Sequence, residues 1–232
     1  MLIAAREPAP GMAKTRLGAT IGMAPAAALY AAFLVDLAAR FTPCQDQEWE
    51  FDVGWAFTPA NVDFANVLQR IGCDPPPPAI RFVAQHGEGW DVRQANILTW
   101  ATEQGYERTV LIGSDSPQLP FTVVRDAVAA LADHDVAMGR TLDGGYYLIG
   151  MRGFHDVLTG VPMSTVSAAD ALAARARDLG LQLAELPVTF DIDEERDLEH
   201  LRRAIAPDGA CAPATWAALQ RLGLADLASD HE

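Results

Sequence analysis

The sequence predicts a three-layer α/β/α protein of the Rossmann-like class, with a mixed and mainly parallel sheet. Apolar strand segments and amphipathic helical segments alternate along the 232 residues. Several strand segments are continuously apolar, which is typical of parallel strands covered on both faces. Hydrophobic residues make up 50% of the chain and charged residues 21%, the composition of an ordinary globular protein. We therefore expect a ligand site at the carboxyl ends of the strands.

The first strand is expected at 2–5, and a loop is expected at 6–18 because Pro8, Pro10 and Gly11 interrupt it. The later segments alternate in type. Strands are expected at 51–57, 80–84, 108–112, 135–138, 146–151 and 182–188. Helices are expected at 25–40, 61–71, 91–103, 121–132, 167–179 and 197–206.

The strand near 146–151 is the expected antiparallel member of the sheet, because a glycine turn connects it to the strand before it. We assign residues 1–206 to one domain. Residues 207–232 form an alanine-rich tail in which Trp216 and Leu219 have helical spacing, so one further helix is expected to dock on that domain.

The charge balance limits the classes of partner. Acidic residues number 31 against 17 basic ones, a net charge of −14 that repels nucleic acid and anionic membrane surfaces. No stretch reaches the ~18 apolar residues of a membrane span, and no signal peptide is recognised. Cys44, Cys73 and Cys211 form no C-x-x-C pair, so zinc or a redox disulfide is not expected. We expect a cytoplasmic protein. The sequence is compatible with a homodimer, and it is also compatible with a translation start upstream of Met1.

The first candidate site is the basic segment after the first strand. Arg6, Lys14 and Arg16 concentrate three cations in an acidic protein, and Gly11 keeps bulky side chains away. Such a segment suits the phosphates of a ligand, whereas an isolated K-T-R triplet is also typical of an exposed basic turn. It is not a Walker A loop, because no glycine precedes Lys14 at the required spacing.

The second candidate is Asp115, which follows Ser114 directly after the apolar strand at 108–112. A carboxylate at this strand end binds a divalent cation or caps the next helix. Pro117 and Pro120 place the start of that helix several residues past Asp115, which favours the metal.

Two further segments carry carboxylates or glycines at strand ends. Asp143, Gly144 and Gly145 allow a ligand to approach the backbone closely, although Asp-Gly is also a common hairpin turn. Asp191 and Asp193 lie on one side of an extended segment, and two such carboxylates need a metal or backbone amides for compensation. The alternative is a solvated acidic turn.

Taken in order, these motifs resemble one family, the bacterial selenodomain-associated transferases, which have the A-type glycosyltransferase (nucleotide-diphospho-sugar transferase) fold. The resemblance covers residues 1 to about 205. The layout is also similar to the guanylyltransferases of molybdenum-cofactor and deazaflavin-cofactor synthesis. The motifs that carry it are the segments 8–17, 113–117, 143–150, 164–165 and 191–198.

The resemblance implies a role for each site residue. Arg6, Gly11, Lys14, Arg16 and Ser114 would bind the nucleotide and its phosphates, with Lys14 and Asp115 catalytic. It further implies Mg²⁺ or Mn²⁺ at Asp115 and at Asp191 or Asp193. On the acceptor side it implies four residues: Asp143, Gly144, Gly145 and Ser164.

The chain departs from the family pattern at three places. Arg6 stands where the family has lysine, Gly89–Arg93 replaces a leucine-glycine-glutamate-arginine run, and Met163 replaces a tryptophan before Ser164. The second departure lies at the start of the helix expected at 91–103 and affects the contacts of that helix with the base or the acceptor.

The leading hypothesis is therefore a metal-dependent transferase that moves a sugar from a nucleotide sugar to an unknown small-molecule acceptor. One rival is nucleotidyl transfer from a nucleoside triphosphate, which needs the same phosphate and metal ligands. Another is a nucleotide-binding protein without turnover, which the altered segment at Gly89–Arg93 permits. A Ser-His-Asp hydrolase has little support, because the chain has no G-x-S-x-G elbow.

Overall fold

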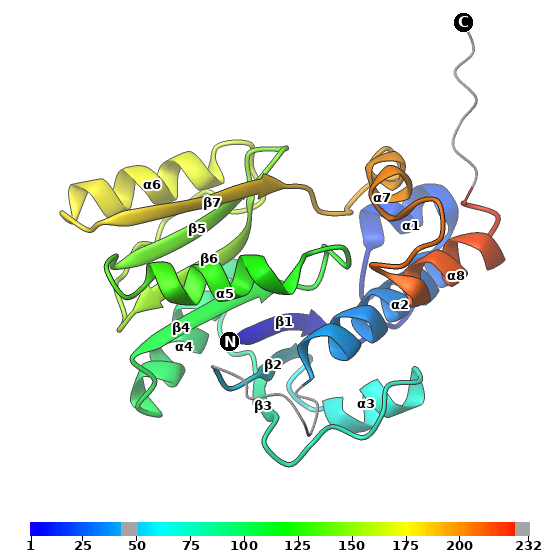
Figure 1. Cartoon of the computed structure of the whole chain (residues 1–232), viewed down its shortest axis with the longest axis horizontal. Helices are drawn as coiled ribbons and strands as arrows, with labels where there is room; N and C mark the ends of the chain where they lie inside the picture. Colours follow the sequence, from blue (N-terminus) through cyan, green and yellow to red (C-terminus); the bar gives the residue numbers. More distant parts are fainter. Residues whose placement is uncertain (43–50, 226–232) are drawn as a thin grey trace, which may run out of the picture.

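The computed structural model describes residues 1–42 and 51–225, and Cys44 lies outside this part (Figure 1). Its strands are β1 (Leu2–Arg6), β2 (Gly54–Thr58), β3 (Arg81–Ala84), β4 (Arg108–Gly113), β5 (Val136–Thr141), β6 (Tyr146–Arg152) and β7 (Leu183–Thr189). Its helices are α1 (Thr15–Ile21), α2 (Met23–Phe41), α3 (Phe64–Arg70), α4 (Trp90–Glu103), α5 (Phe121–Ala130), α6 (Ala168–Asp178), α7 (Asp197–Ile205) and α8 (Pro213–Arg221).

The strands form one seven-stranded sheet in the order β3-β2-β1-β4-β6-β5-β7. Within the described residues β6 alone runs against the others, because it pairs antiparallel with both β4 and β5 while the other pairings are parallel. The expected mixed, mainly parallel sheet with an antiparallel strand near 146–151 is therefore confirmed. This topology brings the C-terminal ends of β1, β4, β5 and β7 to one edge.

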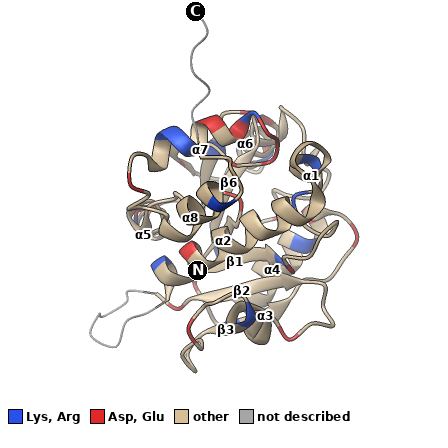
Figure 2. Cartoon of the chain, turned by 90° about the vertical axis from the view of Figure 1, so that its right-hand side faces the viewer, with Lys and Arg blue, Asp and Glu red and all other residues tan. Residues whose placement is uncertain are grey.

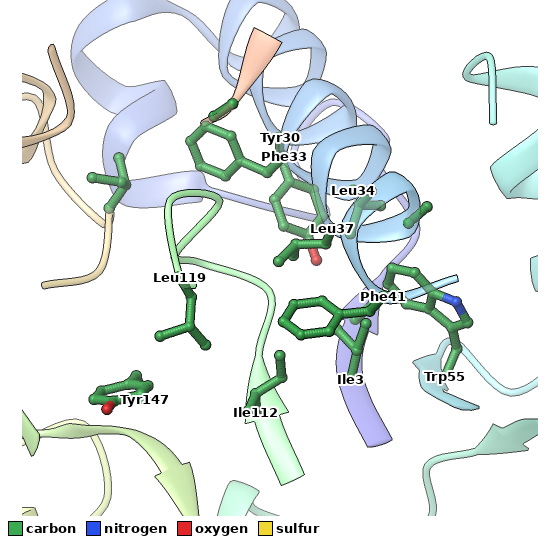
Figure 3. Packing of buried hydrophobic residues seen from close by; sticks show 14 of the residues in the cluster. Ile3, Tyr30, Phe33, Leu34, Leu37, Phe41, Trp55, Ile112, Leu119 and Tyr147 are labelled. Carbon is green, nitrogen blue, oxygen red and sulfur yellow. The ribbon is translucent and has the colours of Figure 1, made fainter. Parts of the chain in front are cut away.

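Alternating side chains of each strand enter two cores, one on each face of the sheet. Ile3 of β1 and Ile112 of β4 pack with the aromatic residues of α2, whereas Leu111 lies on the opposite face with residues of α4 and α6. Figure 3 shows Phe41 of α2 close to Ile3 and Trp55. The three-layer α/β/α expectation is thus confirmed, and both sheet faces are covered.

One expected element is wrong. The segment 6–18 was expected to be a loop throughout, but α1 begins at Thr15. Proline and glycine occupy only the first half of that segment, up to Gly11. The second half becomes helical because Leu17 and Gly18 are buried against α2, where the Cβ of any larger residue at position 18 would lie 2.6 Å from Met23 Sδ.

The tail packs on α2 through buried polar contacts. The carboxylate of Asp36, which is 3% exposed, accepts hydrogen bonds from the backbone amides of Ala214 (2.9 Å) and Thr215 (2.7 Å) at the start of α8. The guanidinium of Arg40 donates to the carbonyls of Leu119 (3.0 Å) and Cys211. The two bonds to Asp36 satisfy amides at the N-terminus of α8 that have no partner within the helix. The bonds from Arg40 connect α2 to the loop before α5 and to the segment before α8.

The helix α2 corrects the expectation that no segment is long and apolar enough for a membrane span. Its 19 residues have a mean hydropathy of 1.4, which passes that test by length and composition. However, 61% of this apolar stretch is buried inside the protein, and the side chains of Phe33, Leu34 and Leu37 belong to the core (Figure 3). Core packing accounts for the apolar composition of α2.

Charged side chains gather on the outer helices. Figure 2 shows acidic and basic segments side by side on α7, whose first turn carries Asp197 and Glu199 and whose last turn carries Arg202 and Arg203. This arrangement matches the helix dipole, because anions are favoured at the N-terminus and cations at the C-terminus.

Candidate functional site

A cleft lies at the C-terminal ends of β1 and β4 and consists of two adjoining cavities of about 570 and 190 Å³. Both cavities are lined by Arg16, Trp90, Asp115, Ser164 and Asp193, so they form parts of one site. The larger cavity also carries the remaining basic residues of the site, which are Arg6, Lys14 and Arg93. The smaller cavity carries further carboxylates, Asp143 and Asp191.

Lys14 lies where the two cavities meet. Its ammonium is 2.5 Å from a carboxylate oxygen of Asp115 and 3.1 Å from one of Asp193, and it donates to the carbonyl of Ile192. The Lys14 side chain is only 4% exposed, whereas the two aspartates are 41% and 43% exposed. Lys14 thus neutralises charges that come from segments 101 and 179 residues along the chain.

The backbone of Lys14 is left-handed, with φ 51°, directly before the first residue of α1. Burial by itself would lower the pKa of Lys14, but the charges of Asp115 and Asp193 outweigh it, so the net shift is upward. The same interaction holds the pKa of Asp193 below its usual range, with Arg16 at 3.5 Å as a weaker contributor. The two carboxylates thus favour the charged form of Lys14 despite its burial.

Hydrogen bonds fix the segment at 190–193 against the loop that follows β4. The amide of Ile192 donates to the carbonyl of Asp115 (3.0 Å), and the side chains of Ser116 (2.8 Å) and Gln118 (3.0 Å) donate to the carbonyl of Phe190. Because Ile192 is fully buried, the two flanking aspartates turn toward the cleft. The structure thus brings Asp191 and Asp193 to the same cavity as Asp115.

Behind Asp115, Tyr30 of α2 connects the ends of β1 and β4. Its hydroxyl accepts from the backbone amide of Arg6 (3.0 Å) and lies 2.7 Å from the hydroxyl of Ser114. Burial, together with the negative charge of Asp115, raises the pKa of Tyr30 to about 12. Ser114 is itself buried. Its hydroxyl therefore positions the strand end as well as facing the larger cavity.

Asp191 is the carboxylate of the site with the least compensation. Burial, followed by repulsion from Asp143, Asp193 and Asp115, raises the pKa of Asp191 to about 7. No hydrogen bond or ion pair links its side chain to another described residue. The negative charge in the smaller cavity exceeds what Lys14 neutralises, which is an arrangement that favours a bound cation.

The turn between β5 and β6 is the hairpin that the Asp-Gly sequence predicts. Asp143 accepts from the hydroxyl of Thr141 (2.5 Å) and from the amide of Gly145 (3.0 Å), so one carboxylate oxygen holds its own turn. Gly144 has φ +91°, and a Cβ there would lie 2.0 Å from the carbonyl oxygen of Val166. Gly144 itself lines neither cavity, whereas Asp143 and Gly145 line the smaller one.

Three residues of α4 that line the cleft, Trp90, Arg93 and Gln94, were not among the site residues expected from the sequence. Trp90 and Arg93 in the first turn of α4 line the larger cavity, with the Arg93 guanidinium 5.9 Å from the Trp90 ring centre. In the smaller cavity Gln94 donates to the hydroxyl of Tyr146 (2.7 Å), which contacts Met163. The glycine-rich segment before α4 is the sequence feature that could have indicated the α4 residues. It places the first turn of that helix at the C-terminal edge of the sheet.

The donor chemistry of the site fits a magnesium or manganese ion that is bound together with phosphates. Within residues 1–42 and 51–225 no three His, Cys, Asp or Glu side chains converge into a complete metal site. Mg²⁺ is commonly held by one or two carboxylates plus substrate phosphates and water rather than by the protein alone. Asp115, which is 41% exposed, and the uncompensated Asp191 supply two such carboxylates.

A family model described as an uncharacterized protein conserved in bacteria, DUF2064, matches residues 39–165. This match covers more than half of the chain. The chain belongs to the DUF2064 family. No protein with curated annotation matches it significantly.

Solved structures resemble this DUF2064 protein to different degrees. A protein of Desulfovibrio desulfuricans G20, provisionally named a nucleotide-diphospho-sugar transferase, is 29% identical with a TM-score of 0.83, over 97% of this chain and 96% of that one. A cytidylyltransferase of Leptospira borgpetersenii is 13% identical with a TM-score of 0.53, over 100% and 97%. The 4-diphosphocytidyl-2C-methyl-D-erythritol synthase of Anaerococcus prevotii is 11% identical with a TM-score of 0.50, over 85% and 94%.

The last two likenesses concern the fold alone. The first extends over nearly the whole of both chains. The three likenesses confirm that this DUF2064 protein has the nucleotide-diphospho-sugar transferase fold.

Proposed function

We propose that this DUF2064 protein moves a sugar from a nucleotide sugar to a small-molecule acceptor, with a divalent metal ion bound to the donor's diphosphate. The observation that carries the proposal is the division of one cleft into a basic and an acidic half that share Asp115 and Asp193. A nucleotide diphosphate needs cations around its phosphates, and a metal needs carboxylates beside them. The similarity to the Desulfovibrio protein supports the same class of donor.

In the proposed reaction an acceptor hydroxyl oxygen forms a bond to the anomeric carbon of the sugar. The bond between that carbon and the diphosphate oxygen breaks, the nucleoside diphosphate leaves with the bonding electrons, and the hydroxyl proton passes to a carboxylate of the acidic half. Arg6 and Arg16 bind phosphate oxygens, while Lys14 holds Asp115 and Asp193 in place. Asp115 and Asp191 would hold the metal ion, which neutralises the departing diphosphate.

The acceptor is proposed to occupy the smaller cavity. Its wall combines the hydrogen-bonding groups of Asp143, Ser164 and Thr165 with the apolar surfaces of Tyr146 and Met163, a combination that suits a small polar molecule with one flat or apolar face. A cytoplasmic location belongs to the same proposal, since Cys73 and Cys211 are free thiols, as is usual in a reducing compartment.

Nucleotidyl transfer from a nucleoside triphosphate, with pyrophosphate leaving, is the second candidate. The larger cavity has more cationic side chains than the carboxylates of the cleft neutralise, because Arg6 and Arg93 have no carboxylate oxygen within 4.0 Å among the described residues. A triphosphate carries more negative charge than a nucleotide sugar and would use that surplus.

A thermal-shift screen with nucleoside triphosphates and nucleotide sugars, each in Mn²⁺ and in EDTA, tests the proposal. A ligand at a hundred times its dissociation constant stabilises by about 2.7 kcal/mol, which is easily measured. We expect a nucleotide sugar to raise the melting temperature in Mn²⁺ only, and Asp115→Asn to abolish that shift while Asp133→Asn, at an exposed residue after α5, preserves it. Equal shifts in EDTA would contradict the metal, and shifts restricted to triphosphates would select nucleotidyl transfer.

A further inference from the structure

Two arginines in the larger cavity lack the ion pairs that the other cations of the site make. Lys14 contacts Asp115 and Asp193, and Arg16 lies 3.5 Å from Asp193. Within the described part of the chain, Arg6 and Arg93 make neither an ion pair nor a side-chain hydrogen bond. Arg6 is exposed and Arg93 is half-buried, so the lack of a partner matters most for Arg93.

The two side chains come from different elements and meet at the same cavity. Arg6 ends β1, Arg93 lies in the first turn of α4, and both line the larger cavity. Burial and then the positive charge of Arg6 lower the pKa of Arg93, and the negative charge of Asp91 offsets this only in part. The Nε atom of Arg93 is buried and has no hydrogen-bond partner in the described structure.

These observations describe a site that is complete only with an anion. A buried N–H donor without an acceptor is unfavourable, and two like charges facing one cavity are unfavourable as well. One anion with several oxygen atoms relieves both, because each guanidinium presents a planar fork of donors that matches phosphate geometry. Trp90 holds the Arg93 guanidinium from one side at 5.9 Å and thereby limits its movement.

Lys14 is a poorer candidate for this role. Its ammonium is 4% exposed and already has three oxygen partners, one each from Asp115, Asp193 and Ile192. A phosphate that recruited Lys14 would leave two carboxylates without their cation. Lys14, which the sequence motif singles out, therefore maintains the geometry of the site. The hydrogen-bond donors that are free to bind a ligand belong to Arg6 and Arg93.

We propose that Arg93 of α4 and Arg6 of β1 together bind a phosphate group of the ligand in the larger cavity. Naming that ligand a nucleotide-activated donor rests on the proposed function, whereas the anion site itself does not. In the site so formed, Arg93 selects for ligands whose phosphate reaches α4, and Lys14 positions Asp115 and Asp193.

The test is isothermal titration calorimetry with inorganic pyrophosphate and with nucleoside diphosphates, in Mg²⁺ throughout. Arg93→Gln and Arg6→Gln are compared with Arg177→Gln, a matched change at an exposed arginine of α6 that makes no ion pair in the described structure. We expect each cleft variant to bind pyrophosphate roughly tenfold or more weakly than the wild type, and Arg177→Gln to bind like the wild type. Arg93→Lys should be intermediate, since an ammonium keeps the charge but loses the planar fork.

The outcomes separate this proposal from the proposed function. Pyrophosphate binding that depends on Arg93, in a protein that binds no nucleotide sugar or triphosphate, would support the anion site and overturn the transferase. Nucleotide binding that is equally strong in Arg93→Gln and Arg177→Gln would overturn the anion site and leave the transferase standing. A wild-type protein that binds neither pyrophosphate nor a nucleotide would overturn the anion site too. Circular dichroism melting checks that each variant is folded.

Discussion

Replacement of Lys14 by methionine removes one positive charge and keeps the length of the side chain. In the wild type the ammonium lies 2.5 Å from Asp115 and 3.1 Å from Asp193 and is 4% exposed. The variant leaves these carboxylates facing Asp191 without a buried cation. Loss of one partner from a fully buried ion pair costs about 3–5 kcal/mol.

The expected destabilisation is smaller than that, because the two aspartates are 41% and 43% exposed and water can solvate them after the substitution. We therefore expect Lys14→Met to lower the free energy of unfolding by about 2 kcal/mol. For a chain of this length that corresponds to a fall in melting temperature of roughly 4–8 °C.

The effect should depend on pH in a defined direction. Lys14 depresses the pKa of Asp193, so this carboxylate contributes stability above its unfolded pKa and loses it as pH falls through the folded pKa. The pKa of Lys14 is raised, so its contribution is fully present below the unfolded pKa and is lost as pH rises through the folded pKa. The difference between wild type and variant should be constant from about pH 5 to 9 and shrink in acid, below about pH 4.

The assay is urea unfolding of wild type, Lys14→Met and Arg177→Met at several pH values, in EDTA. Arg177 is exposed on α6, so its replacement controls for the loss of one positive charge from the acidic protein as a whole. A variant as stable as Arg177→Met at pH 7 would refute the reasoning, and so would a difference that grows toward acid.

Two further predictions concern Asp191 in the smaller cavity and Gly144 in the turn between β5 and β6. Asp191→Asn should stabilise the protein at pH 8 in EDTA by about 1–2 kcal/mol after allowance for solvent screening, because a carboxyl whose folded pKa is raised to about 7 opposes folding when it is charged. The gain should disappear near pH 4, and melting curves that show the same gain at both pH values would contradict it. Gly144→Ala should destabilise by about 1–3 kcal/mol, since φ +91° and the carbonyl of Val166 leave no place for a Cβ, and Gly180→Ala, where nothing lies within 4 Å at φ +70°, separates the clash from the backbone strain.

The placement of Asp115 was predictable because it depends on local order alone. A continuous apolar strand ends at Gly113, and two prolines delay the next helix to Phe121, so the intervening carboxylate is held at the sheet edge. Asp143 and Asp191 follow the same rule, since β5 and β7 run parallel to β4 and end at the same edge. Strand polarity is thus enough to bring residues 115, 143 and 191 to one cleft.

The partner of Lys14 was not predictable in this way. Its contact with Asp193 joins residues 179 positions apart and depends on the left-handed backbone that precedes α1, a helix of seven residues without a side-chain cap. The helix α1 was not predictable from the sequence either. It depends on the burial of Leu17, which is a tertiary contact. A short helix that is stabilised by tertiary contacts has little intrinsic propensity to reveal it.

Arg93 shows the limit most clearly. From the sequence it is an arginine in the first turn of a helix, where a cation is unfavourable with respect to the helix dipole, and Asp91 in the same turn offsets this only in part. A residue that conflicts with the local preference of its helix is a candidate functional residue, because natural sequences depart from such preferences mainly at functional positions. The structure supplies the second half of the argument, because Arg6 reaches the same cavity from β1 and raises the electrostatic penalty instead of relieving it. An anion bound between the two arginines removes the conflict with the dipole and the mutual repulsion together.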